Sequence, residues 1–166
     1  MQVNNLLVPR RVDNDQFVGN NAGESRHLGI ETEVSLLNRL SELRYEIWGN
    51  YTFMDHRFVD FRDEEQEAIF DGNAIPGIPR HHATTGLILS YPLGQKASSP
   101  MLGFQINGQF TSAMPLRDDN VLFSEAYQVW NGKFTWQQRL KEFGYGLSIG
   151  SQNIFDARYA SMILIN

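Results

Sequence analysis

Three basic side chains stand together at Arg80, His81 and His82, directly after the proline-containing stretch 75–79. Cationic groups attract an anionic ligand, so these three residues are the first candidates for a binding role. The alternative is structural, in which Arg80 and His81 fix the place where a strand begins at the rim of a sheet. Both interpretations stay open for these residues.

A second concentration of charge lies in residues 60–71, which carry Asp60, Asp63, Glu64, Glu65, Glu67 and Asp71. Carboxylates bind hard cations such as Ca²⁺, but these lack the D-x-[DN]-x-[DN]-G order that fixes ligand geometry. His27 and Glu31 fall on one face of an alternating run, where a strand holds them about 13 Å apart, too far to share an ion. We therefore predict a solvated acidic loop, and no metal or cofactor.

Catalytic patterns are missing from the sequence. It has no cysteine, and Ser148 and Ser151 stand in strand-like runs without a nucleophile elbow. No glycine-rich phosphate loop and no H-E-x-x-H motif occur. The net charge of −5 gives no electrostatic footprint for nucleic acid. We predict that the protein is not an enzyme and has no nucleic-acid partner.

The element that would position the candidate residues is a long strand at residues 43–55. Apolar and polar side chains alternate along it, which is the period-two pattern of a strand with one apolar and one polar face. Trp48 is the exception, because it falls on the polar face. A strand in a soluble sheet covers about five or six residues, whereas a tilted membrane-crossing strand needs about 9–11. The length of the run therefore favours a membrane strand.

Similar alternation recurs in residues 26–36, 82–91, 101–112, 125–137 and 145–152, and residues 3–8 form a further short apolar segment. We predict that one face of the resulting sheet meets lipid, through Tyr45, Ile47, Phe53, Leu87, Leu89, Leu102, Phe104, Ile106, Phe110, Trp130, Phe134 and Trp136. The other face is predicted to line a lumen, through Arg44, Glu46, Asn50, Gln105, Asn107 and Gln109. The first set should be convex and the second concave.

The connections alternate in length. Long ones fall at 9–25, 56–80 and 113–124, and short ones at 37–42, 92–100 and 138–144, which is the layout of an outer-membrane barrel. The fold class predicted is all-β: part of an antiparallel transmembrane β-barrel wall, an open curved sheet of about seven strands. Bacterial single-chain barrels have eight or more strands and lipid does not tolerate open edges, so we expect a fragment of a larger barrel.

Other classes stay open from these patterns alone. A soluble β-sheet binding module, such as a carbohydrate-binding sandwich, and an outer-membrane barrel of another class also fit alternating strands. No apolar run is long enough for a transmembrane helix, and residues 1–5 do not resemble a signal peptide. Either the chain is cytoplasmic or it is a piece of a longer protein. The mean hydropathy of −0.36 excludes neither, because alternation hides the apolar face of a barrel strand.

Three stretches resemble the C-terminal barrel region of TonB-dependent outer-membrane receptors. Residues 21–31 are similar to the family pattern N-A-G-x-[ST]-x-x-x-G-[ILV]-E, residues 75–81 to P-x-x-P-R-H, and residues 151–159 to N-[IL]-F-D-x-x-Y. Residues 160–166 are similar to the segment that comes after this last pattern in receptors for iron complexes. The order and spacing of these stretches extend the resemblance over nearly the whole chain.

The resemblance implies that residues 1–166 are the C-terminal part of a receptor barrel of 22 strands, without the plug domain, the TonB box and the final strand. It implies a transporter in the outer membrane of a Gram-negative bacterium that imports a ferric siderophore or similar nutrient. The implied partners are outer-membrane lipid, the nutrient, and TonB through the missing N-terminal region. Arg80, His81 and His82 are then the candidate contacts for an anionic ferric chelate.

Overall fold

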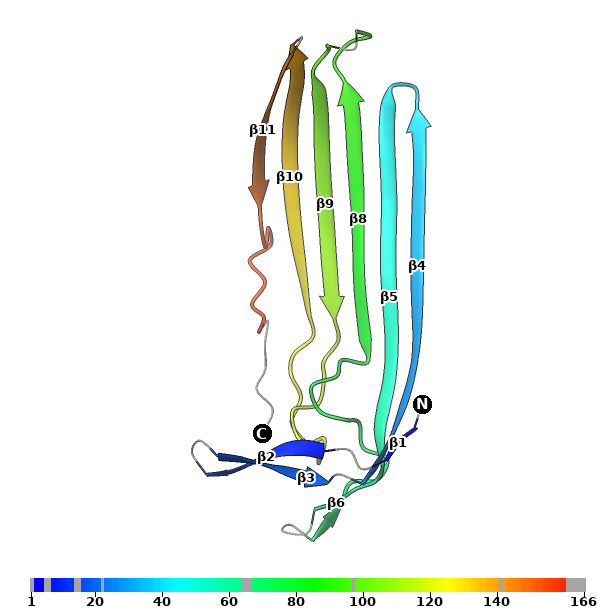
Figure 1. Cartoon of the computed structure of the whole chain (residues 1–166), viewed down its shortest axis with the longest axis vertical. Helices are drawn as coiled ribbons and strands as arrows, with labels where there is room; N and C mark the ends of the chain where they lie inside the picture. The colour runs from blue at the N-terminus through cyan, green and yellow to red at the C-terminus, as the bar shows by residue number, and fades with distance from the viewer. Residues whose placement is uncertain are drawn as a thin grey trace.

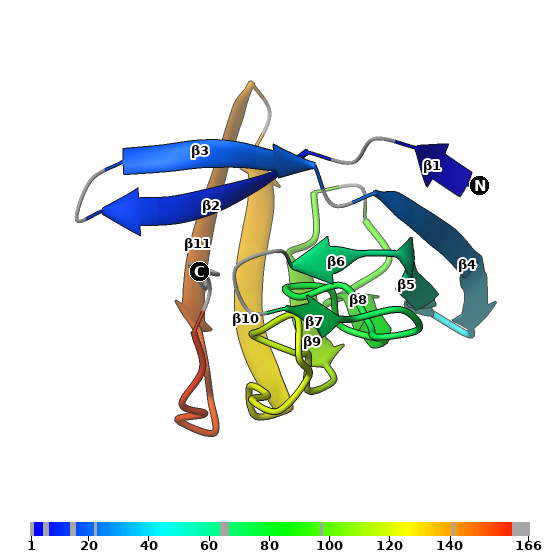
Figure 2. The same cartoon turned by 90° about the horizontal axis from the view of Figure 1, so that it is seen from below.

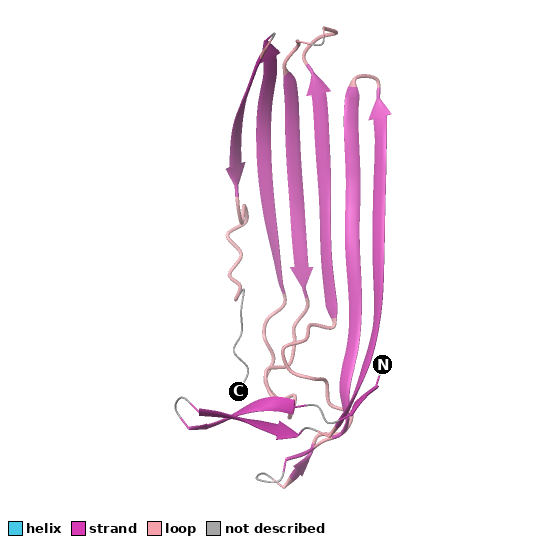
Figure 3. Ribbon diagram, in the orientation of Figure 1, coloured by secondary structure: helices cyan, strands magenta, loops and turns pink. Residues whose placement is uncertain are grey.

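The computed structural model describes residues 2–4, 7–13, 16–21, 23–63, 67–96, 98–140 and 142–160. These residues form strands and loops, with one antiparallel seven-stranded sheet in the order β1-β4-β5-β8-β9-β10-β11 (Figures 1 and 3). The all-β class and the open sheet of seven strands confirm the prediction from sequence. Within the described part of the chain, no helix is long and apolar enough to cross a membrane.

Six long strands make up the wall of this sheet. They are β4 (Glu24–Leu40), β5 (Leu43–Asp60), β8 (His81–Pro92), β9 (Met101–Thr111), β10 (Tyr127–Leu140) and β11 (Phe143–Ser151). The short strand β1 (Gln2–Asn4) pairs with the start of β4. Consecutive long strands are hydrogen-bonded neighbours, so each pair is an antiparallel hairpin.

The short and long connections lie at opposite ends of the sheet. The turn between β4 and β5 is only two residues, with Ser41 at a φ of 54°, and a similarly short turn joins β10 and β11. The longer connections 61–80 and 112–126 lie at the other end (Figure 1). β11 runs toward that end but stops at Ser151, opposite Gly132 inside β10. The alternation in connection length is as predicted.

Two expectations about boundaries were wrong. Residues 9–25 were predicted as loop, but they include most of a separate two-stranded hairpin, formed by β2 (Leu7–Asp13) and β3 (Gln16–Asn21), and the first residues of β4. Pro9 lies in β2, where proline is tolerated because, among the described strands, β2 has a neighbour on one side only. The strands predicted at 26–36 and 43–55 extend further, to 17 and 18 residues, because their pairing continues to Glu24 and Asp60.

The extra length carries β4 and β5 well beyond the other strands. At about 3.4 Å per residue they are roughly 55–60 Å long, against an apolar band of about 25 Å in an outer-membrane barrel. The 11 residues of β9 fit such a band when tilted. The long loop 61–80 is therefore built on an extension of β4 and β5 that continues past Phe53 and His81, the last residues paired between β5 and β8, with β1 paired to the start of β4.

The main apolar core lies under this loop. Phe58 is 1% exposed and packs against Phe61 and Phe70, with ring centroids 4.6 Å apart for Phe58–Phe61 and 5.6 Å for Phe61–Phe70. Two further short strands, β6 (Arg62–Asp63) and β7 (Ala68–Ile69), complete the loop. Seen along the strands, the sheet is an open arc, and β6 and β7 lie on its inner side (Figure 2). The sheet itself is a single layer.

Candidate functional site

The register of the sheet assigns each strand residue to one of two faces, because residues directly opposite in an antiparallel pair project to the same side. Ile47 lies opposite Leu87, Leu87 opposite Ile106, and Ile106 opposite Gly132. Following the same ladders, all twelve residues expected to meet lipid fall on this one face, which we call the apolar face: Tyr45, Ile47, Phe53, Leu87, Leu89, Leu102, Phe104, Ile106, Phe110, Trp130, Phe134 and Trp136.

The residues between them form the second face, which we call the polar face. Glu46 lies opposite Ile88, Ile88 opposite Gln105, and Gln105 opposite Lys133. All six residues expected to line a lumen share this face: Arg44, Glu46, Asn50, Gln105, Asn107 and Gln109. Phe58 shares it as well, through its pairing with Ser25, and packs on the loop inside the arc. The polar face is therefore the concave one.

Exposure follows the same division. Among the described residues of the six long strands, every large apolar side chain that is strongly exposed lies on the apolar face except Leu37. The charged residues are divided in the same way between the Leu28–Asp55 pair and the short turns. In this part of the six long strands, the apolar face carries one charged residue, Asp55. The polar face carries seven: Glu31, Glu33, Arg39, Arg44, Glu46, Lys133 and Arg139. Between Asp55 and the short turns the apolar face is therefore exposed, continuous and uncharged, and such a surface marks contact with an apolar environment.

A shallow hollow of about 650 Å³ lies on the polar face. Its floor includes Asn50, Thr84, Asn107, Gln109 and Asn131 from four neighbouring strands, and Gln152, Asn153 and Tyr159 from the chain after β11 also line it. Amide and hydroxyl groups dominate this lining, so it suits water and hydrogen-bonding ligands. Asn131 Oδ1 already accepts a hydrogen bond of 3.0 Å from the backbone N–H of Asn153.

Trp48, the exception to the alternation, also lines this hollow. Its indole lies over Gly86, directly opposite on β8, so close that a Cβ on Gly86 would stand 2.5 Å from the ring. The absent side chain makes room for the indole on a face that is otherwise polar. On the apolar face Trp130 covers Gly108 in the same way, at 2.8 Å.

The structure separates the three candidate ligand residues. His81 lies opposite Phe53 on the apolar face, and its Nδ1 shares a hydrogen bond of 2.8 Å with the Tyr51 hydroxyl. His82 lies on the polar face, where its Nδ1 is 3.1 Å from Thr111 Oγ1. The Arg80 guanidinium is 5.3 Å from the Phe53 ring centroid, on the apolar side. These three side chains therefore do not converge on one ligand.

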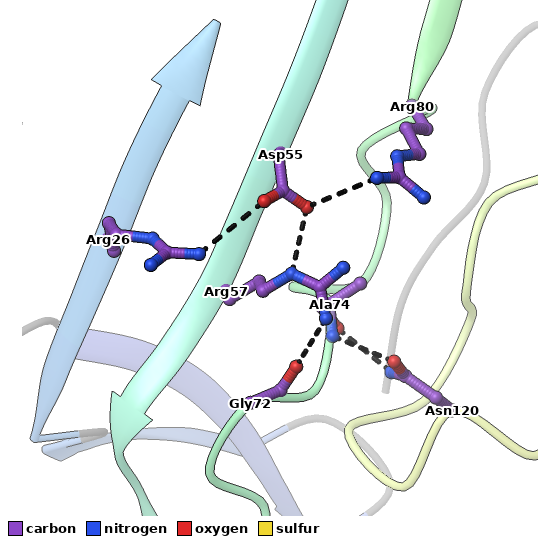
Figure 4. Close-up of polar contacts among 7 residues, drawn as sticks. All are labelled: Arg26, Asp55, Arg57, Gly72, Ala74, Arg80 and Asn120. Atoms are coloured by element: carbon purple, nitrogen blue, oxygen red, sulfur yellow. Dashed lines mark hydrogen bonds and ion pairs between the residues drawn. The ribbon is translucent and has the colours of Figure 1, made fainter.

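Arg80 instead joins a charged group that the sequence analysis did not identify (Figure 4). Asp55 Oδ1 accepts a hydrogen bond of 2.8 Å from Arg57 Nε and lies 3.9 Å from Arg80 Nη2. Asp55 Oδ2 is 3.5 Å from Arg26 Nη2. One signal in the sequence could have located this group. Asp55 and Arg57 occupy the next two positions of the apolar face after Phe53, but both are charged, which marks the end of the apolar band.

A second polar group ties the two long loops together. The Asn120 side chain accepts a hydrogen bond of 2.8 Å from the backbone N–H of Ala74 and donates one of 2.8 Å to the Ala74 carbonyl (Figure 4). Asn73 Nδ2 adds a third bond of 2.8 Å to the Asp118 carbonyl. The loops 61–80 and 112–126 therefore form one unit at the end of the barrel wall.

Metal ligation finds little support in the described residues, which contain no group of three or more histidine, aspartate, glutamate or cysteine side chains placed to share an ion. The nearest approach is a histidine pair on the polar face, with the His27 and His56 rings 4.5 Å apart. His27 Nε2 is 2.9 Å from Ser25 Oγ, and His56 Nδ1 is buried without a hydrogen-bond partner. Part of the acidic segment 60–71 lies outside the described residues.

Comparison with known proteins places this geometry in context. The family described as "TonB dependent receptor-like, beta-barrel" matches residues 1–154. Among solved structures, the fold is similar to BauA, the ferric preacinetobactin receptor from Acinetobacter baumannii, with a TM-score of 0.65 at 15% sequence identity. That alignment covers 90% of this chain and 21% of BauA, so the chain spans about a fifth of that receptor's length. No curated protein matches the sequence.

Proposed function

We propose, from the premise that this chain belongs to the TonB-dependent receptor-like β-barrel family, that it forms part of the wall of a nutrient transporter. The observation that supports this proposal best is the separation of the two faces across six strands, with an uncharged apolar surface on the convex side. The family consists of transporters rather than enzymes, and it belongs to the outer membrane of Gram-negative bacteria. We place this chain in that membrane as part of the proposal.

Lipid is the proposed partner of the apolar face. Ile47, Leu87 and Ile106 form a continuous row across three strands, and Phe104 and Phe134 continue the surface in the next row. In water such an exposed apolar surface would drive association between molecules, whereas contact with lipid tails shields it from water. Tyr45 and Trp136 stand toward the short turns and Tyr51 and Phe53 toward the loops, the positions of interfacial aromatic girdles.

The polar face is proposed to line the lumen. Gln105, Asn107 and Gln109 alternate along β9 with the apolar side chains, and their amides are suited to water or to a plug domain. The resemblance implies that the plug, the TonB box and the closing strand belong to sequence beyond residues 1–166. We propose that this sheet is roughly the C-terminal third of such a barrel without its final strand, and that its two edges pair with the remaining strands, because lipid does not tolerate unpaired backbone groups.

The proposed substrate class is a ferric siderophore or a similar nutrient, taken up by energy supplied through TonB. It is supported by the resemblance of residues 160–166 to receptors for iron complexes, and by the similarity in fold to a protein named as the ferric preacinetobactin receptor. Of the three candidate contacts, His82 faces the lumen and remains the better candidate. Arg80 and His81 face the other side.

The test is uptake of radioactive iron by cells that express the polypeptide as its gene encodes it, with any sequence on either side of residues 1–166. Cells are supplied with a panel of ferric siderophores, in a host lacking its own receptors, with and without TonB. The proposal predicts uptake of at least one complex that requires both the polypeptide and TonB. A polypeptide found only in the soluble fraction, or TonB-independent accumulation, would contradict it.

A further inference from the structure

We propose that Arg26, Arg57 and Arg80, grouped around Asp55, bind the phosphate group of an anionic lipid head group. We call these four residues the arginine cluster. They come from β4, from β5 and from the residue before β8, and they meet at the end of the apolar face nearest the long loops (Figure 4). This inference rests on the proposed function, since it requires the apolar face to lie in a membrane.

The arginine cluster lies at the end of the apolar face. Arg26 lies opposite Arg57 and Leu28 lies opposite Asp55, so these residues continue the apolar face by register. Arg80 reaches the same side, because its guanidinium stands over the Phe53 ring. The cluster therefore comes directly after the last apolar row and lies where the head groups would be if that row marks the edge of the hydrocarbon.

The charge balance leaves the cluster cationic. Three guanidinium groups surround a single carboxylate, and the Asp55 side chain is only 16% exposed. Arg57 is already engaged, with Nε on Asp55 and Nη1 donating a bond of 2.8 Å to the Gly72 carbonyl. It holds Asp55 in place and ties the cluster to the loop.

Arg26 and Arg80 are the two groups with capacity for a ligand. Each side chain is 56% exposed, and their contacts with Asp55 are long, at 3.5 and 3.9 Å. Guanidinium groups present forked N–H donors that match phosphate oxygens two at a time. Two exposed arginines converging on one carboxylate would hold a phosphate between them, on the solvent side of Asp55.

The aromatic residues beside the cluster fit an interfacial position. Tyr51 and His81 share a hydrogen bond one row below, and Phe53 lies under Arg80. Arginine stems lie along apolar surface while their charged ends reach polar head groups. The opposite rim of the apolar face, near the short turns, has no such charge on its described strand residues, which include Tyr45, Tyr91, Gln138 and Tyr145. The arginine cluster would therefore bind lipid head groups at only one of the two membrane surfaces.

The test uses the polypeptide as its gene encodes it, folded into vesicles of phosphatidylcholine alone or with added phosphatidic acid. Matched vesicles contain diacylglycerol of the same acyl chains, which lacks the phosphate. Affinity is measured by competition with a fluorescent phosphatidic acid at low salt. Each basic side chain near an anionic surface contributes about fivefold, so the double variant R26Q/R80Q should bind phosphatidic acid on the order of 20-fold more weakly.

Two further variants separate folding from binding. R44Q/R139Q removes the same charge from the polar face and should leave lipid affinity unchanged, while R26K/R80K keeps the charge and should retain part of it. Heat-modifiable migration on gels confirms that each variant is folded. Equal affinity in wild type and R26Q/R80Q, no preference over diacylglycerol, or full competition by millimolar inorganic phosphate would overturn the inference. Failure to insert into neutral vesicles would instead overturn the proposed function.

Discussion

Gln105 and Ile106 are neighbours in β9 whose side chains project to opposite faces of the sheet. Ile106 stands beside Leu87 on the apolar face, and Gln105 stands beside Ile88 on the polar one. Two adjacent residues at the middle of one strand therefore face the two environments that the proposed function requires, and they give a matched pair for mutation.

Replacing Ile106 by Arg in the polypeptide as its gene encodes it should destabilise the inserted state by about 2–4 kcal/mol, because a cation would face lipid near the midplane. Gln105→Arg introduces the same side chain on the lumen side and should cost much less. The free energy of unfolding of each variant is measured by denaturant-induced unfolding from lipid vesicles. Equal losses for the two variants would mean that the faces are not assigned as proposed.

Gly86→Val should disturb the polar face through Trp48. A Cβ at this position stands 2.5 Å from the indole, so Trp48 has to rotate away, and overpacking of this kind costs typically about 1–3 kcal/mol. Trp48 fluorescence in a variant whose other tryptophans are replaced by phenylalanine reports the movement. The double variant G86V/W48A should recover stability. If G86V/W48A loses as much stability as the two single variants added together, the contact between residue 86 and Trp48 does not explain the destabilisation by G86V.

Asn120→Gly should loosen the connection between the two long loops. Asn120 has a φ of 53°, which glycine also adopts, so the substitution removes the two hydrogen bonds to Ala74 without adding backbone strain. We expect a loss of about 1–3 kcal/mol in the local opening of the loops. Hydrogen exchange at the Ala74 amide should speed up. Val121→Ala, at a neighbouring side chain that is 78% exposed, is the control and should leave this exchange unchanged.

Phe58→Ala should release the loop 61–80 from the extension of β4 and β5. Removing a buried phenylalanine costs about 3–5 kcal/mol, and Phe58 is the most buried large side chain of the aromatic core with Phe61 and Phe70. Limited proteolysis should then cut within residues 61–80 while leaving β8 to β10 intact. Val59→Ala, on the opposite face and 42% exposed, should not change the cutting pattern.

The faces of the sheet were predictable because they depend on a local signal. Alternation along each run, such as Gln105 to Phe110, assigns a residue to a face whatever its partner strand is, and register then only aligns faces already defined. The ends of the strands were not predictable in this way. Beyond Phe53 the alternation changes from apolar to charged at Asp55 and Arg57, and only pairing with β4 shows that the strand continues.

The site residues show the same limit. Arg80, His81 and His82 are adjacent in sequence, but a strand sends His81 and His82 to opposite faces. The arginine cluster joins residues 26, 55, 57 and 80, which β4, β5 and the residue before β8 bring together. Contacts between residues far apart in sequence depend on register and loop path, which no local pattern encodes.

The central claim, that the apolar face meets lipid and the polar face meets water, is tested most directly by spin-label accessibility along β9. Residues 1–166 contain no cysteine, so single cysteines from 101 to 111 can be labelled within this chain without removing native ones. In lipid vesicles, labels at 102, 104, 106 and 110 should relax more with oxygen, and labels at 105, 107 and 109 with a water-soluble nickel complex. Uniform accessibility along the strand, or the opposite phase, would contradict the account.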